Sequence, residues 1–153
     1  MNDFPFSDWK EIFSNLYHMV IAYALAFPIG WERETSSRSA GLRTFPLVAV
    51  AACGYLITGI SVLESSEAYA RIIYGLMTGI GFIGGGAILK GAGSVTGTAT
   101  AASIWNTGAI GMAVAFQRWE IAILLSALNF ITLRFVRTIK RRIGAHDSPS
   151  QNE

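Results

Sequence analysis

Charged side chains are scarce in this sequence of 153 residues, and their scarcity excludes most soluble folds. Only 14% of the residues are Asp, Glu, Lys or Arg, against about a quarter in ordinary soluble domains. The few charges also cluster, so that between residues 72 and 117 the one charged side chain is Lys90. A soluble helical bundle would need polar helix faces, which such neutral runs do not provide. The deficit therefore predicts a membrane protein.

The sequence also lacks the residues that several kinds of chemistry require. Its single cysteine, Cys53, excludes an internal disulfide and a cysteine-based metal cluster. Neither an H-E-x-x-H nor a D-x-D motif occurs, and of the acidic residues only Glu32 and Glu34, at a membrane edge, could serve a Mg²⁺ ion. The net charge of +2 is too small to predict binding to nucleic acid. We therefore expect no enzymatic activity, no cofactor and no bound metal.

Apolar residues, in contrast, make up 52% of the chain and gather into long runs. A membrane-spanning helix needs about 20 mostly apolar residues, within a range of about 17 to 25. Runs that reach or approach this length cover residues 12–31, 45–63, 72–89, 98–116 and 121–136. We therefore predict an all-α membrane bundle of about five transmembrane helices over residues 12–137. A periplasmic segment (1–11) would precede it, and a short cytoplasmic tail (138–153), disordered at its end, would follow.

The basic residues predict how these helices are oriented. With five spans, the 12 Lys and Arg residues divide nine to three between the two sides of the membrane. The larger group is Arg33, Arg38, Arg43, Lys90, Arg134, Arg137, Lys140, Arg141 and Arg142. Because cytoplasmic loops are enriched in Lys and Arg, we expect the C-terminus in the cytoplasm and the N-terminus outside.

A glycine-rich stretch, GIGFIGGGAI at residues 79–88, fits the pattern G-x-G-x-x-G. A dinucleotide-binding turn would need an acidic residue about 20 positions further on, and none follows. Glycines four residues apart instead allow membrane helices to approach closely; they form two pairs, Gly75 with Gly79 and Gly81 with Gly85, joined by Gly84.

Two interpretations of these glycines are open. In the first, the third and fourth helices form the close-packed centre of the bundle, and a large side chain at Gly81 or Gly85 disrupts folding or assembly. In the second, the third helix is broken within the membrane and exposes carbonyl groups to an ion, or it lines a pathway.

Polar residues within or beside the apolar runs are the remaining candidates for a site. Ser103, Asn106 and Thr107 share one helix face, where they would form interhelical hydrogen bonds or line a permeation or ligand site. A second group borders the first two runs and consists of Glu32, Arg33, Glu34, Arg43 and Thr44. These are either solvated loop charges or a functional polar cluster, in which Glu32 and Arg33 turn inward and pair with Arg43.

Four stretches occur in a set order: GWERE at 30–34, AGLRTFPLVAVAA at 40–52, GIGFIGGGAIL at 79–89 and VTGTATAASIWNTGAIGMA at 95–113. Together they resemble the MgtC/SapB family of bacterial inner-membrane proteins over about residues 20–115. Two stretches depart from the usual pattern, ALAFPIG before the first motif and GTAT at 97–100. We expect no counterpart of the C-terminal soluble domain that larger members carry.

The resemblance implies five spans, a cytoplasmic C-terminus and a role in growth at low magnesium and in survival inside host cells. It implies a non-enzymatic protein that modulates a membrane partner such as the F-type ATP synthase, with an ion transporter or channel for Mg²⁺ or H⁺ as the alternative. Besides the lipid bilayer, a further copy of the chain is a candidate partner. The positions that the motifs carry over are Glu32, Arg33, Glu34, Gly41, Leu42, Arg43, Thr44, Gly79, Gly81, Gly84, Thr100, Ser103 and Trp105.

Overall fold

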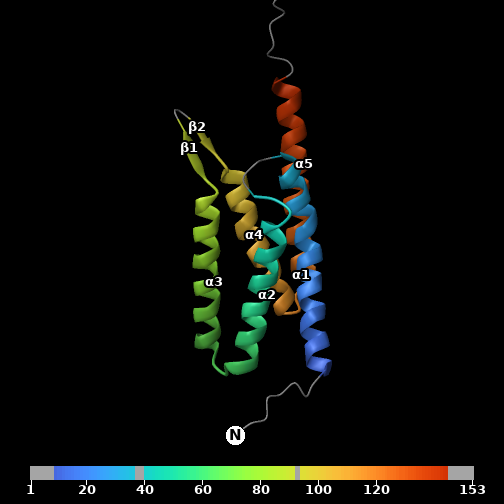
Figure 1. Ribbon diagram of the computed structural model, residues 1–153, viewed down its shortest axis with the longest axis vertical. Coiled ribbons are helices and arrows are strands. Elements are labelled where there is room, and N and C mark those ends of the chain that lie inside the picture. Colours follow the sequence, from blue (N-terminus) through green and yellow to red (C-terminus); the bar gives the residue numbers. More distant parts are fainter. Residues whose placement is uncertain (1–8, 37–39, 92–93, 145–153) are drawn as a thin grey trace, which may run out of the picture.

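The protein is a bundle of helices in the computed structural model, which describes residues 9–36, 40–91 and 94–144. Its elements are α1 (Trp9–Ser36), α2 (Thr44–Val62), α3 (Ser66–Gly86), β1 (Leu89–Gly91), β2 (Ser94–Thr96), α4 (Thr98–Ala115) and α5 (Trp119–Gly144). The helices alternate in direction, so α1 begins and α5 ends at opposite ends of the bundle (Figure 1). The prediction of an all-α membrane bundle is confirmed.

Several element boundaries differ from those predicted. Helix α1 begins at Trp9 and α5 continues to Gly144, because hydropathy indicates where an apolar run ends and not where a helix ends. The strands β1 and β2, which were not predicted, pair antiparallel between α3 and α4, with Lys90 opposite Val95. The segments 1–8 and 145–153, and Arg38 in the loop after α1, lie outside the described residues.

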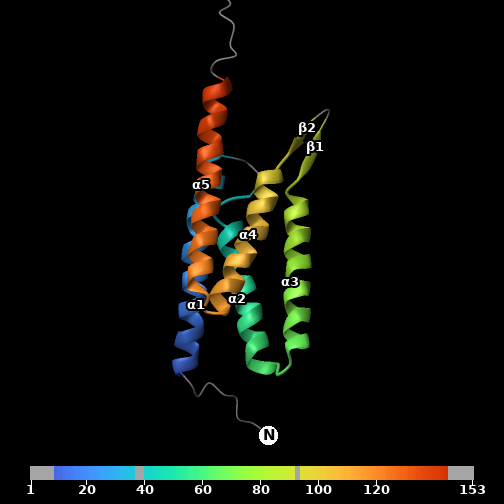
Figure 2. The same ribbon diagram turned by 180° about the vertical axis from the view of Figure 1, so that it is seen from behind.

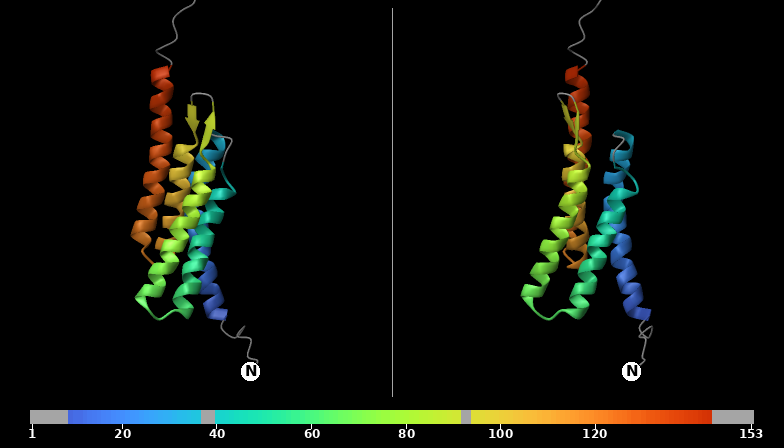
Figure 3. Two further views of the ribbon diagram at one scale, coloured as in Figure 1. Left: turned by 90° about the vertical axis from the view of Figure 1, so that its left-hand side faces the viewer. Right: turned by 60° about the vertical axis from the view of Figure 1, so that its left-hand side comes forward.

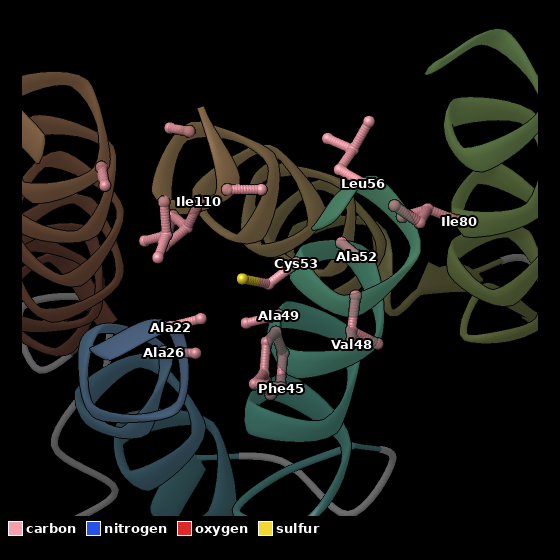
Figure 4. Close-up of a cluster of buried hydrophobic side chains, with 14 of the residues drawn as sticks. Ala22, Ala26, Phe45, Val48, Ala49, Ala52, Cys53, Leu56, Ile80 and Ile110 are labelled. Carbon is pink, nitrogen blue, oxygen red and sulfur yellow. The ribbon is translucent and has the colours of Figure 1, made fainter. Parts of the chain in front are cut away.

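Small side chains contribute to the interior of the bundle together with larger ones such as Phe45 and Ile110, and many large apolar side chains lie exposed on its outside. Ala22 and Ala26 of α1 face Ala49 of α2 in the buried cluster (Figure 4), and all three are fully buried. Phe13 and Phe135, in contrast, are each 65% exposed. Helices in lipid associate by close packing of small residues, since lipid is as apolar as their large side chains. This distribution therefore fits a bundle that is surrounded by lipid.

In the part of the chain that the structure describes, three helical segments are long and apolar enough to cross a membrane, namely Trp9–Thr35, Thr44–Val62 and Trp119–Val136. The other two helices, α3 with 21 residues and α4 with 18, carry half of the 16 glycines, six in α3 and two in α4. Their helical form is confirmed, whereas their passage through the membrane stays a prediction.

Helix α4 is the close-packed centre of the bundle, as predicted. A Cβ atom on Gly111 would overlap the backbone carbonyl oxygen of Ala49 in α2. A Cβ atom on Gly108 would overlap the side chain of Ile80, which reaches in from α3 (Figure 4). The glycines of α4 thus let two neighbouring helices approach it at once.

The prediction that α3 shares this central position is wrong. A Cβ atom on any of five α3 glycines would meet nothing within 4 Å: Gly75, Gly79, Gly81, Gly85 and Gly86. Gly84 alone packs closely, with its Cβ position 3.2 Å from the Ala101 carbonyl oxygen. Helix α3 stands at the edge of the bundle in opposite views (Figures 1 and 2).

This geometry corrects part of each interpretation of the α3 glycines. A Cβ atom on Gly81 or Gly85 meets nothing within 4 Å, so the predicted close contact of these two residues inside the bundle is wrong, whereas an effect of a large side chain on assembly stays a prediction. Helix α3 is continuous from Ser66 to Gly86 and is therefore not broken over these residues, whereas a pathway-lining role stays a prediction. Helix periodicity identifies which glycines share a face, but it does not reveal whether a neighbour covers that face.

Candidate functional site

The last turns of α1 carry three consecutive charges whose side chains reach different parts of the protein. Successive helical residues point about 100° apart. Glu32 turns toward α5, where its carboxylate lies 3.5 Å from Nη1 of Arg134. The Glu32 side chain is 4% exposed and that of Arg134 is 69% exposed. A buried carboxylate is thus paired with a cation that extends from the surface.

Arg33 connects the same end of α1 to α4. Its Nη2 donates a hydrogen bond to the hydroxyl of Thr100, which is fully buried in the first turn of α4. The preceding Gly97 adopts a φ of 87° as the N-cap of α4, in the left-handed region that favours glycine. The Nε of Arg33 is buried and has no acceptor among the described residues.

Glu34 closes the connection between α1 and α2. Its Oε2 accepts a hydrogen bond of 3.0 Å from the backbone N–H of Leu42. A Cβ atom on Gly41 would occupy the position of the Glu34 carboxylate, and one on Gly30 would lie 3.2 Å from Leu42 Cα. These two glycines therefore allow the loop to fold back onto the end of α1.

Arg43 does not join this cluster, contrary to the predicted pairing. It is exposed immediately before α2, and among the described residues the carboxylate of Glu32 is paired with Arg134 instead. Arg43 and Thr44 line a groove between α2 and α3. The inward orientation of Glu32 and Arg33 is confirmed, and they are not solvated loop charges.

The polar face of α4 lies against α5. The Ser103 hydroxyl donates to Asn129 Oδ1 at 2.9 Å, and Asn106 Nδ2 donates to the Leu125 carbonyl oxygen at 3.2 Å. Thr107 instead donates to the Ser103 carbonyl of its own helix at 2.7 Å. The expected interhelical hydrogen bonds are therefore present, whereas a permeation role stays a prediction. Trp105, a motif position, is 47% exposed.

Sequence reasoning did not identify two residues that hold α5 in place. The Ser126 hydroxyl donates to the Leu25 carbonyl of α1 at 2.6 Å, and Arg134 pairs with Glu32. A usable signal was the spacing of Ser126 and Asn129, which puts two polar residues on one face of an apolar helix. With these contacts, α1, α4 and α5 are joined by polar bonds along their shared interface.

The geometry is that of a structural junction. Within the described ranges, no three His, Cys, Asp or Glu side chains gather as a group that could hold a metal ion. His18, near the opposite end of α1, stacks on Trp119 with ring centroids 5.4 Å apart. Its Nδ1 lies 2.7 Å from the Ser14 carbonyl oxygen of its own helix, and through the stacking on Trp119 the imidazole contributes to the contact between α1 and α5.

Comparison with known proteins identifies one matching family and several similar proteins. The sequence model of the MgtC family matches residues 19–142. Protein SrpB of Synechococcus elongatus is 29% identical over 150 residues, covering 90% of this chain and 81% of that protein.

Protein MgtC of Brucella abortus is 36% identical over 104 residues, which cover 68% of this chain and 43% of the Brucella protein. The putative magnesium transporter YhiD of Escherichia coli K12 is 30% identical over 135 residues, covering 84% of this chain and 63% of YhiD. The chain thus spans less than half the length of the Brucella protein. No solved structure matches the chain.

Proposed function

The chain belongs to the MgtC family, and from this premise we propose that it is a non-enzymatic membrane protein that modulates a membrane partner during adaptation to low magnesium. The names of two relatives, MgtC and the putative magnesium transporter YhiD, support the connection with magnesium. The resemblance noted from the motifs adds the F-type ATP synthase as a candidate partner. The chain resides in the bacterial inner membrane, crosses it five times and has its C-terminus in the cytoplasm.

One observation carries this proposal, namely the glycine surface on α3, at Gly81 and Gly85, that the described residues leave uncovered. Gly81 and Gly85 lie four residues apart, and a Cβ on either would meet nothing within 4 Å. Small residues at this spacing are those through which membrane helices pack against one another. In α4, glycines are in close contact with α2 and α3. Helix α3 therefore has a glycine surface that is suited to helix packing and that no described helix contacts.

Polar bonds between α1, α4 and α5, which we call the polar junction, are expected to hold the helix that supports this surface in a fixed position. Bonds from Arg33 to Thr100 and from Ser103 to Asn129 connect α1, α4 and α5. Helix α3 in turn rests on α4 through Gly84. We propose that the polar junction keeps α4 in position and that α4 in turn holds α3 with Gly81 and Gly85 facing the partner.

The test separates the use of this surface from the stability of the fold. Gly81→Leu and Gly85→Leu variants are expected to reach normal membrane abundance, because a Cβ atom at either position meets nothing within 4 Å, yet to lose support of growth at low magnesium. Leu128→Phe is the matched control, since Leu128 is 61% exposed on α5 and is expected to retain function. Normal growth of both glycine variants at normal abundance would refute the proposal.

An ion transporter for Mg²⁺ or H⁺ is the second candidate. The polar residues that α4 and α5 share favour it, because Ser103 and Asn129 are bonded to each other within the bundle and Asn129 Nδ2 is buried without a described acceptor. If these residues line a pathway, Ser103→Ala should abolish growth at low magnesium without altering abundance. If they are structural, that variant should lower abundance and growth together.

A further inference from the structure

A groove runs along the bundle between α2 and α3. Its volume is about 910 Å³, within the range of about 300 to 1,000 Å³ that is typical of small-molecule sites. The two helices are joined at one end (Figure 3), and in the view of Figure 1 they diverge toward the other end, where α2 begins. The groove lies between these helices and has α2 residues from Arg43 to Tyr55 along one wall.

The inner part of the groove is apolar and smooth. Ala51 and Ala52 form part of the α2 wall, and Gly75 and Gly79 form part of the α3 wall. Neither of these two glycines meets a neighbour within 4 Å of its Cβ position. From Thr44 to Tyr55 the α2 wall extends about 16 Å at 1.5 Å per residue, which matches the depth of one leaflet in a hydrocarbon core about 30 Å thick.

The end of the groove where α2 begins is cationic. Arg43 is the one charged residue in the lining, and beside it stands the hydroxyl of Thr44. No described carboxylate pairs with Arg43. Thr44 also begins α2, and the N-terminus of a helix favours negative charge. The apolar groove, which is about as long as one leaflet is deep, therefore ends at three groups that attract an anion: the Arg43 guanidinium, the Thr44 hydroxyl and the N-terminus of α2.

We propose that this groove binds one anionic phospholipid, with an acyl chain between α2 and α3 and the phosphate on Arg43 and Thr44. Basic pockets between membrane helices are suited to anionic headgroups, and Arg binds phosphate through its planar guanidinium fork. The proposal rests on the proposed membrane topology, because α3 must lie beside α2 in the bilayer. It uses the Gly75 and Gly79 side of α3, whereas the proposed partner uses Gly81 and Gly85.

The test uses the purified full chain in phosphatidylcholine vesicles that contain a spin-labelled lipid, either phosphatidylglycerol or phosphatidylcholine. Electron paramagnetic resonance measures the fraction of labelled lipid that the protein immobilises. The wild type is expected to prefer phosphatidylglycerol. Arg43→Gln should reduce that preference about fivefold, the equivalent of one basic contact with an anionic lipid surface. Gly79→Phe places an aromatic ring at a position that lines the groove and whose Cβ meets nothing within 4 Å, and it should release the lipid.

Two matched controls accompany these variants. Arg71→Gln removes an exposed cation near the start of α3, at the other end of the bundle, and Gly85→Phe adds the same ring on a different side of α3. Both should keep the wild-type preference. If all variants retain it, or if Arg71→Gln loses it as Arg43→Gln does, the proposed site is wrong. If Gly79→Phe instead changes the oligomeric mass and leaves lipid binding intact, the groove holds a second copy and the lipid proposal fails.

Whether α3 crosses the membrane, as the proposed topology requires, is tested separately in the same vesicles. Cysteines introduced at Glu64 and Lys90, before and after α3, should react with an impermeant maleimide from opposite sides of the vesicle. Labelling from the same side would overturn the topology and with it the lipid site. Labelling from opposite sides without a preference for phosphatidylglycerol would overturn the lipid site alone.

Discussion

Three consecutive residues at the end of α1 each fix a different segment of the chain. Glu32 pairs with Arg134, Arg33 bonds to Thr100, and Glu34 accepts the N–H of Leu42. That charges beside an apolar run turn inward could be predicted from the sequence. Their partners could not, because Thr100 is 67 residues from Arg33 and is brought there by the direction of α4. Arg43 was nearer in sequence, but it lies at the groove.

The contribution of the Arg33 bond can be measured with two threonines that are both fully buried in α4. Thr100 accepts a bond from a guanidinium group of another helix, whereas Thr107 bonds to a carbonyl of its own helix. We expect Thr100→Val to destabilise the protein by about 2 kcal/mol, because it leaves a buried charged donor without this acceptor. Thr107→Val should cost less than about 1 kcal/mol.

Thermal unfolding of the purified variants in detergent provides the comparison. A larger loss for Thr107→Val than for Thr100→Val would show that the link between α1 and α4 contributes little to the fold.

Helices α3 and α4 show that glycine serves two purposes in one bundle. The two glycines of α4 lie against neighbouring helices, whereas a Cβ on five of the six glycines of α3 would meet nothing within 4 Å. The number and order of the helices and the small residues of α4 could be predicted from the sequence. The length of an apolar run and the spacing of its small residues are local properties of the sequence. The peripheral position of α3 could not be predicted, since small residues attract either an internal or an external neighbour.

Alanine substitution distinguishes the two kinds of glycine. Gly111→Ala places a Cβ against the backbone of α2, which cannot move aside as a side chain would. We expect it to destabilise the protein by about 1 to 3 kcal/mol, as overpacking typically does. Gly85→Ala should leave stability unchanged or raise it by up to roughly 1 kcal/mol, because alanine favours the helix. Equal losses of thermal stability in both variants would contradict the arrangement of α3 and α4.

At the scale of the whole molecule, the alternating directions of the helices place the basic residues in two groups, one at each end of the bundle. Arg33, Arg43, Lys90 and Arg134 lie at or near the end where α1 and α5 finish, and Arg71 and Arg118 lie near the other end (Figure 1). This sorting agrees with the nine-to-three division predicted from the sequence. Which end faces the cytoplasm follows from the positive-inside rule and stays a prediction.

Labelling of intact cells tests this orientation. In a Cys53→Ala background, Glu64→Cys is expected to react with an impermeant maleimide added outside, whereas Lys90→Cys should react only after the cells are permeabilised. Both positions are exposed. Wild-type Cys53 is buried and serves as the unreactive control. The reverse pattern would invert the topology, and equal external labelling would show that α3 does not cross the membrane.

In the proposed function, the protein acts on a membrane partner and does not itself move ions. Flux of Mg²⁺ and H⁺ into liposomes that contain only the purified full chain tests this claim most directly, with insertion verified by the cysteine labels. We predict flux no greater than in protein-free liposomes, for the wild type and for Gly85→Leu alike. Flux several times that background, lost in Ser103→Ala, would contradict the claim and establish a transporter.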